Sequence, residues 1–153
     1  MRVAIVRSLF NRPVTDGLLE GALSALVEMG APRSRVAVFD LPGAFELPLA
    51  AKAAARSGRF DAVVALGAVI EGETDHYEHV AREAAAGLAA VARETGVPVA
   101  FGVLTVRQEE QARRRAAPGP DNKGGEAARA AVTTAVALRA IVGRRTGARR
   151  RSR

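Results

Sequence analysis

The sequence predicts a single α/β domain of three layers, in which helices cover both faces of a four-stranded parallel sheet. Short runs of apolar and β-branched residues alternate with longer segments whose apolar residues recur at helical spacing. The run FDAVVALGA at residues 60–68 is apolar at almost every position, which is typical of a strand covered on both faces. The 153 residues show no internal repeat and no dividing linker, so we expect one core.

Local signals bound each expected element. Strands are expected at residues 3–6, 36–39, 60–68 and 97–105, and helices at about 16–29, 47–58, 75–95 and 125–142, with a short helix after residue 108. Thr15 or Asp16 can cap the first helix, and Gly30 would end it. Asp75 and Glu78 have the spacing of a capping box at the start of the third long helix.

The positive charge of the chain is concentrated at its C-terminal end. The formal net charge is +7, and the last ten residues, RRTGARRRSR, carry six arginines and no acid, which leaves +1 for the rest. We expect residues 1–143 to form the domain and residues 144–153 to be a disordered, Arg-rich tail. Such a tail can simply keep a protein soluble. It is also the one part in which we expect any binding of RNA or another polyanion.

Composition excludes several other classes of protein. The chain has no cysteine, which excludes disulfides, zinc–thiolate sites and cysteine nucleophiles and fits a reducing compartment. Arg7 interrupts the first apolar run after four residues, so we expect no signal peptide, and no stretch approaches the length of a membrane span. The motifs GxGxxG, GxxxxGK[ST] and GxSxG do not occur. We expect a cytoplasmic protein that does not bind membranes.

Polar and aromatic residues follow the ends of the expected strands. Phe10 comes just after the first strand, and the turn PGAFE at 42–46 follows the second. The stretch EGETDHYEH at 71–79 follows the third strand, and the fourth ends near Thr105. Because ligands of open parallel sheets bind beyond the carboxyl ends of the strands, these segments predict a site by position alone.

The stretch at 71–79 holds four acids and two histidines. Gly72 and Thr74 at a helix start suit an anion such as phosphate, although helix capping alone would also explain Thr74. His76 would lie in the first helical turn, and histidine is the residue type that most often transfers protons near neutrality, although most helical histidines are ordinary surface residues. Together with His79 it has the spacing of two metal ligands, but no third ligand is evident.

Two further groups of residues have both a functional and a structural interpretation. Phe10 could stack on a planar ring or could pack in the core. Arg113–Arg115 and Asn122–Gly124 flank a loop rich in Pro and Gly. Their cations could bind phosphate or a carbonyl group, although a solvated run of charges is the usual explanation.

Taken together, these segments resemble those of the lumazine synthase family, 6,7-dimethyl-8-ribityllumazine synthase. The matching segments span about residues 3–140 and read FN at 10–11, LLEGA at 18–22, PGAFELP at 42–48, LGAVI at 66–70, GETDHY at 72–77, PVAFGVLT at 98–105, EQA at 110–112, RA at 115–116 and NKG at 122–124. Each segment alone is modest support. The full set, in this order and at compatible spacing, is highly specific.

The resemblance implies a flavodoxin-like fold and a particular reaction. The family joins 5-amino-6-(D-ribitylamino)uracil to 3,4-dihydroxy-2-butanone 4-phosphate and releases phosphate and water, which gives the lumazine precursor of riboflavin. It uses no cofactor and no metal. The resemblance also implies a homo-oligomer, a pentamer or a multiple of it up to an icosahedral shell, with each active site between two subunits.

The same resemblance implies the role of individual residues. His76 would move protons. The pyrimidine and its ribityl chain would be bound by Phe10, Ala44, Phe45, Glu46, Val69, Ile70, Phe101 and Lys123. The phosphate would be bound by Gly72, Glu73, Thr74 and Arg115. Of these residues, Phe101, Arg115 and Lys123 would come from the adjoining subunit.

Three features depart from the family pattern. One is that Ala117 and Asp121 stand in the Pro/Gly loop where glycine is common, so the loop is expected to be stiffer. Glu71 stands where the family usually has a basic residue, near the expected phosphate pocket. We predict that its side chain faces outward or pairs with an arginine. The first strand begins almost at Met1, so we do not expect the additional N-terminal strand that many relatives contribute to a neighbour's sheet.

Two functions of other classes remain open. A flavodoxin-like module could bind a flavin or a lumazine without turnover. A structural or nucleic-acid-binding protein could use the Arg-rich tail as its working part. The combination of His76, Thr74 and Arg115 favours the enzyme, since binding alone needs no such set.

Overall fold

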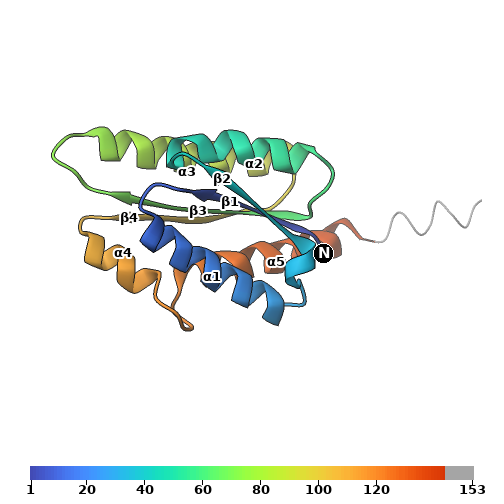
Figure 1. Ribbon diagram of the computed structural model, residues 1–153. Coiled ribbons are helices and arrows are strands. Elements are labelled where there is room, and N and C mark those ends of the chain that lie inside the picture. The colour runs from blue at the N-terminus through green and yellow to red at the C-terminus, as the bar shows by residue number, and fades with distance from the viewer. Residues whose placement is uncertain (144–153) are drawn as a thin grey trace, which may run out of the picture.

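Four parallel strands form one sheet whose two faces are covered by helices (Figure 1). A computed structural model describes residues 1–143, so the predicted tail at 144–153 lies outside the described residues. The strand order is β2-β1-β3-β4, and the strands are β1 (Val3–Ser8), β2 (Val36–Leu41), β3 (Ala62–Ile70) and β4 (Val99–Val106). The predicted three-layer, flavodoxin-like α/β domain is thereby confirmed.

The two central strands, β1 and β3, are buried because both of their faces are covered. Every residue of β1 is buried between β2 and β3. Val3 and Ile5 point into the core on one face of the sheet, and Ala4 and Val6 point into the core on the other. β3 is buried continuously from Ala62 to Val69, as its unbroken apolar run predicts.

Three helices pack on one face of the sheet (Figure 1). They are α1 (Arg12–Glu28), α4 (Glu109–Arg115) and α5 (Lys123–Val142). α1 and α5 lie so close that a side chain at Gly124 would overlap the backbone oxygen of Leu18. Small residues therefore set the distance between these two helices.

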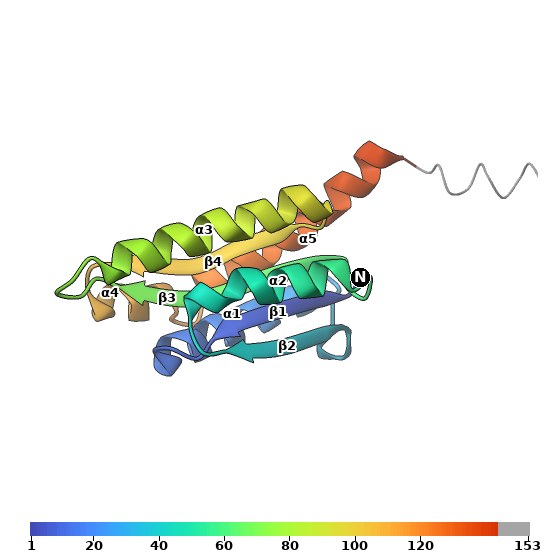
Figure 2. The same ribbon diagram turned by 90° about the horizontal axis from the view of Figure 1, so that it is seen from above.

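Two helices lie side by side on the opposite face (Figure 2). They are α2 (Leu47–Arg56) and α3 (His76–Thr95). Here too a glycine permits close packing, because a Cβ atom at Gly87 would lie 2.7 Å from the ring of Pro48. Short 3-10 turns precede β2 and α2, at Arg33–Arg35 and Ala44–Glu46.

The first helix begins one turn earlier than predicted. Asn11 is its N-cap, in a left-handed conformation with φ of 58°, and Pro13 lies in its first turn. Thr15 is buried inside the helix, and Asp16 pairs with Arg7 instead of capping. Proline fits the first helical turn because no amide hydrogen is needed there, and asparagine tolerates the left-handed conformation.

The parallel arrangement brings the carboxyl ends of all four strands to one edge of the sheet (Figure 1). The turns that lead into α1, α2, α3 and α4 therefore gather at this edge. Within residues 1–143, no helix has both the length and the apolar character that crossing a bilayer requires.

Candidate active site

A cavity of about 630 Å³ opens at the carboxyl ends of β1, β2 and β3, where the sequence places the site. Three turns build it, those that follow β1, β2 and β3, together with the first turns of α3. The lining residues are Phe10, Pro42, Gly43, Ala44, Phe45, Glu46, Ala68, Val69, Ile70, Gly72, Thr74, His76, Tyr77, His79 and Val80. We call this hollow the aromatic cavity.

Phe10 is presented by the tight turn between β1 and α1. The buried hydroxyl oxygen of Ser8 accepts a hydrogen bond from the Phe10 backbone N–H at 3.2 Å, and Asn11 then reverses the chain in its left-handed conformation. The ring is 62% exposed, so the alternative interpretation of Phe10 as a core residue is wrong. An exposed aromatic ring beside an open cavity can stack on a planar ligand.

The turn after β2 supplies a second exposed ring. Ala44 is buried under this turn, whereas Phe45 is 62% exposed and lines the aromatic cavity together with Glu46. The 3-10 turn at Ala44–Glu46 runs directly into α2 and fixes the direction of these side chains. The aromatic cavity therefore combines mostly apolar lining residues with a carboxylate, which suits a flat ring that carries hydroxyl groups.

The turn from β3 into α3 brings Gly72, Thr74 and His76 to the same cavity. The Thr74 hydroxyl oxygen lies 3.5 Å from the His76 backbone nitrogen and accepts its hydrogen bond. The first turn of α3 directs backbone N–H groups towards the turn, and the positive end of the helix dipole favours a bound anion there.

The predicted capping box at Asp75 and Glu78 does not form. Asp75 is the N-cap residue of α3, but its side chain makes no capping hydrogen bond in the described structure. Its backbone is helical, with φ of −71° and ψ of −1°, whereas a capping side chain needs an extended backbone at the N-cap. Capping therefore does not explain Asp75, whereas the hydrogen bond from the first residue of α3 to the Thr74 hydroxyl keeps the capping interpretation of Thr74 open.

The four acids at 71–79 are all exposed, which limits their repulsion of an anion. Glu73 is not among the residues that line the aromatic cavity. The Glu71 carboxylate lies 3.9 Å from the Arg107 Nε, so the prediction that Glu71 pairs with an arginine is confirmed.

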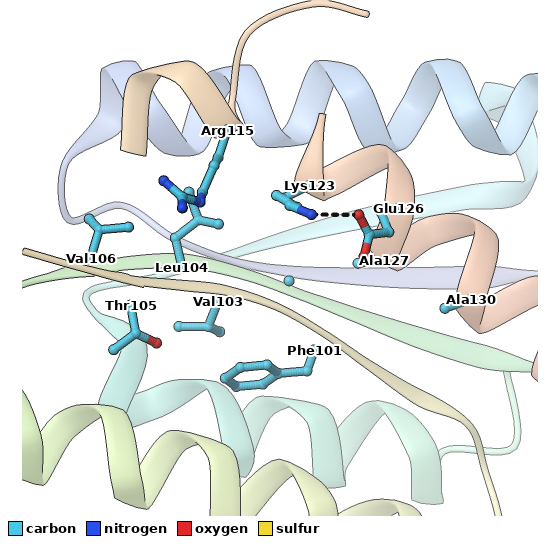
Figure 3. A pocket seen from close by; sticks show the side chains of 11 residues that line it. Phe101, Val103, Leu104, Thr105, Val106, Arg115, Lys123, Glu126, Ala127 and Ala130 are labelled. Carbon is cyan, nitrogen blue, oxygen red and sulfur yellow. Dashed lines mark hydrogen bonds and ion pairs between the residues drawn. The ribbon is translucent and has the colours of Figure 1, made fainter. Parts of the chain in front are cut away.

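A second cavity, of about 270 Å³, lies beside β4 and the start of α5 (Figure 3). Phe101, Arg115 and Lys123 line it, which places these three predicted residues together but away from the aromatic cavity. Arg115 and Lys123 lie on the α5 side of β4, and the Phe101 ring points to the other side of that strand (Figure 3). We call this hollow the cationic cavity.

Each cation of the cationic cavity is held by a neighbour on its own element. Arg115 donates a hydrogen bond from Nη1 to the Gln111 backbone oxygen at 3.1 Å. Lys123 donates from Nζ to the Glu126 carboxylate at 2.8 Å, and this hydrogen bond lowers the pKa of Glu126 below its usual value. Both cations remain partly exposed, so an anion can reach them.

Three lining residues lie in segments that the sequence places at the site, but neither the residues nor the resemblance gave them a substrate-binding role. Tyr77 and His79 line the aromatic cavity, and Thr105 lines the cationic cavity. The spacing of three between His76 and His79, considered above only for a metal pair, puts both on one face of a helix and so also brings His79 to the cavity. Among residues 1–143 no group of three or more His, Asp or Glu side chains is placed to hold a metal ion.

The family of the chain follows from a comparison with models of protein families. Residues 1–139 match the family described as 6,7-dimethyl-8-ribityllumazine synthase. The matched range contains all the residues that line the two cavities, so the match includes the site as well as the scaffold. The chain therefore belongs to the 6,7-dimethyl-8-ribityllumazine synthase family and is an enzyme of the transferase class.

Proposed function

We propose that this enzyme joins 5-amino-6-(D-ribitylamino)uracil to 3,4-dihydroxy-2-butanone 4-phosphate in the cytoplasm, releasing phosphate and water. One observation carries the proposal. The aromatic cavity combines an exposed ring at Phe10, the start of α3 at Thr74 and the imidazole of His76. A platform for a flat pyrimidine, an anion site and a proton carrier are the three parts that this condensation needs.

The pyrimidine would stack on Phe10 at the mouth of the aromatic cavity. Val69 and Ile70, at the end of β3, would contact its edge, partly through the backbone. Ala44, Phe45 and Glu46 would surround the ribityl chain, with the Glu46 carboxylate accepting hydrogen bonds from its hydroxyl groups. The apolar walls support this arrangement because they favour a planar ring over bulk water.

The phosphate would lie at the turn from β3 into α3. Gly72 and Thr74 line the cavity there, and Glu73 would contribute through its backbone because its side chain is exposed. His76, the first residue of α3, stands two residues after Thr74 and lines the same cavity, so its imidazole would reach a group held next to the phosphate. It would carry protons during condensation of the amine with the ketone, loss of phosphate and ring closure.

The cationic cavity would complete the aromatic cavity of a neighbouring subunit. Within one chain Phe101, Arg115 and Lys123 line a different hollow from Phe10 and His76, which supports a site that two copies share. The ring of Phe101 is 48% exposed on the edge strand β4, where a second copy can cover it. We propose a closed ring of copies, because a ring of heterologous contacts leaves no interface unpaired. The number five, or a multiple of it, is what the resemblance to the family implies.

Across that interface the two cations would bind different substrates. Arg115 would bind the phosphate, since a guanidinium can donate two parallel hydrogen bonds to it. Lys123 would donate a hydrogen bond to a carbonyl oxygen of the pyrimidine. The carboxylate of Glu126 holds Lys123 only as a partly exposed pair, so the exchange of partners costs little.

The experiment mixes purified protein with the two substrates and follows the absorbance of the lumazine product. Wild type is compared with His76→Ala and Arg115→Ala, each checked for folding and oligomeric state. We expect product from the wild type and a rate at least about tenfold lower in both variants. A folded, oligomeric wild type that binds lumazine but forms no product would instead show a binding module.

A further inference from the structure

One buried amide joins the two cations of the cationic cavity. Asn122 is 2% exposed and lies directly before Lys123, the first residue of α5. Its Nδ2 donates hydrogen bonds to the backbone oxygens of Ala116 and Ala117, both at 3.0 Å. A third contact, at 3.1 Å, goes to the backbone oxygen of Gly17 in α1.

The same side chain also fixes the start of α5. Its Oδ1 accepts a hydrogen bond from the Gly125 backbone N–H at 3.0 Å, which makes Asn122 the N-cap of the helix that begins with Lys123. Ala116 directly follows Arg115, the last residue of α4. One amide group therefore holds both the backbone next to Arg115 and the backbone next to Lys123, across a loop rich in Pro and Gly.

Two glycines of α1 leave room for the Asn122 side chain and the loop to pack against this helix. A Cβ atom at Gly21 would overlap the Asn122 side chain, and one at Gly17 would lie 2.5 Å from the Ala116 backbone oxygen. Gly17 and Gly21 are four residues apart, so they lie on the same face of α1. The loop and the Asn122 amide therefore pack directly against the backbone of α1 at these two glycines.

We propose that Asn122 is a positioning residue that sets the separation of Arg115 and Lys123, and with it the spacing between the phosphate and the pyrimidine in the site. This inference rests on the proposed function. Arg115 and Lys123 lie on the same side of β4 (Figure 3), and each would hold one of the two substrates. A condensation between two bound molecules is sensitive to their separation, and a displacement of about 1 Å can lower the rate by orders of magnitude.

The test compares Asn122→Asp and Asn122→Ser with the wild type. Both variants retain an oxygen that can accept the Gly125 hydrogen bond, and both lose the amide NH2 group that donates to three backbone oxygens. Asn122→Asp replaces that group by an acceptor, and Asn122→Ser leaves only a hydroxyl on a shorter side chain. We expect the Michaelis constants for both substrates to rise and kcat/KM to fall about tenfold or more.

Leu26→Val is the control. Leu26 is fully buried in α1, the helix that Asn122 contacts at Gly17, but it lies near the far end of that helix. This substitution should lower Tm and leave both Michaelis constants unchanged.

Gly17→Ala separates positioning from stability in a second way. Its added methyl group would have atoms of Ala116 as its nearest neighbours, among them the backbone oxygen to which the Asn122 Nδ2 donates. It therefore shifts the backbone beside Arg115, whereas the hydrogen bond between Gly125 and the Asn122 Oδ1 at the start of α5 lies outside these contacts. We expect it to raise the Michaelis constant of the phosphate substrate and the inhibition constant of inorganic phosphate, with the constant for the pyrimidine near wild type. It also keeps the test decisive if neither Asn122 variant folds.

The outcomes distinguish this inference from the proposed function. If the wild type and Leu26→Val are active, and the Asn122 and Gly17 variants differ from them only in Tm, Asn122 merely stabilises the fold and the inference is overturned. If the folded wild type shows no turnover, the proposed function fails and the inference fails with it. Raised Michaelis constants that follow the pattern above would establish Asn122 as a positioning residue.

Discussion

The Arg107 Nε lies 3.9 Å from a carboxylate oxygen of Glu71, so the acid that follows β3 is paired with a cation that follows β4. The two side chains are 85% and 50% exposed, respectively. The pair connects the turn into α3 with the turn into α4 and neutralises a negative charge near the expected phosphate site. The charge of Glu71 is thus balanced within the same subunit.

Glu71→Ala should be almost neutral. Exposed ion pairs contribute little, so we expect the free energy of unfolding to change by less than about 1 kcal/mol and the Michaelis constant of the phosphate substrate by less than about twofold. Arg107→Ala leaves Glu71 unpaired, so we expect it to raise the Michaelis constant of the phosphate substrate by more than Glu71→Ala changes it. Urea denaturation and steady-state kinetics measure both effects. A large gain in phosphate-substrate affinity in Glu71→Ala would show instead that Glu71 repels the phosphate despite its pairing.

Arg7→Met should destabilise the fold in a pH-dependent way. The Arg7 side chain is 5% exposed; its Nε donates to Asp40 at 2.8 Å, and it also pairs with Asp16. The hydrogen bond from Arg7 lowers the pKa of Asp40 below its ordinary value of 3.8. Because the pKa is lower in the folded state, this contribution is fully present above about pH 4 and is lost as the pH falls through the lowered pKa.

We therefore expect Arg7→Met to lower the free energy of unfolding by about 2 kcal/mol at pH 7. This is less than the usual cost of breaking a buried ion pair, because the two acidic partners are half exposed. Its stability should also depend less steeply on pH below about 4 than that of the wild type. Denaturant unfolding between pH 3 and pH 7 measures both effects. Arg12→Met is the matched control, since the exposed Arg12 reaches Asp16 only at 3.8 Å and is the weakest of the causes that lower the pKa of Asp40. Equal pH profiles for wild type and Arg7→Met would contradict this explanation.

The sequence was sufficient to predict the sheet and its layers, because apolar runs of strand length alternate with helical spacing along the whole chain. It was less informative about helix starts. Asp75 has the preferred residue type for a cap but a helical backbone, whereas the box forms at Gln108 and Gln111, where the N-cap backbone is extended. Capping depends on the backbone angles at the N-cap, which tertiary packing decides and residue type alone does not.

The site was predictable to a similar degree. Strand ends identified the turns at Phe10, at 42–46 and at 71–79, because position in a parallel sheet determines where ligands bind. That Phe101 and Arg115 line a second hollow is a result of tertiary structure. The resemblance implied that they serve a neighbouring subunit, but spacing along the chain carries no such information.

Deletion of residues 144–153 should leave catalysis unchanged. The cavities are lined by residues 10 to 130, and the deletion removes six of the positive charges that give the chain its net charge of +7. We expect wild-type kcat and KM, and the loss of any binding to RNA, which would otherwise weaken steeply with salt. Steady-state kinetics and electrophoretic mobility shifts with labelled RNA measure these outcomes. Activity lost together with the tail would count against the site as described.

Mixing two impaired variants should restore activity if each site is shared between subunits. His76 lines the aromatic cavity and Arg115 the cationic cavity, so the two substitutions damage different halves of a site. When His76→Ala and Arg115→Ala subunits are unfolded, mixed in equal amounts and refolded together, random assembly leaves about a quarter of the sites with both halves intact.

We therefore expect lumazine formation at about a quarter of the wild-type rate from the mixed assemblies, and far less from either variant refolded alone. A mixture of His76→Ala with Phe10→Ala is the control. Both of these residues line the aromatic cavity, so every site keeps a defect and no activity should return. No recovery in the first mixture, with oligomers of normal size, would show that a single subunit supplies both halves of the site.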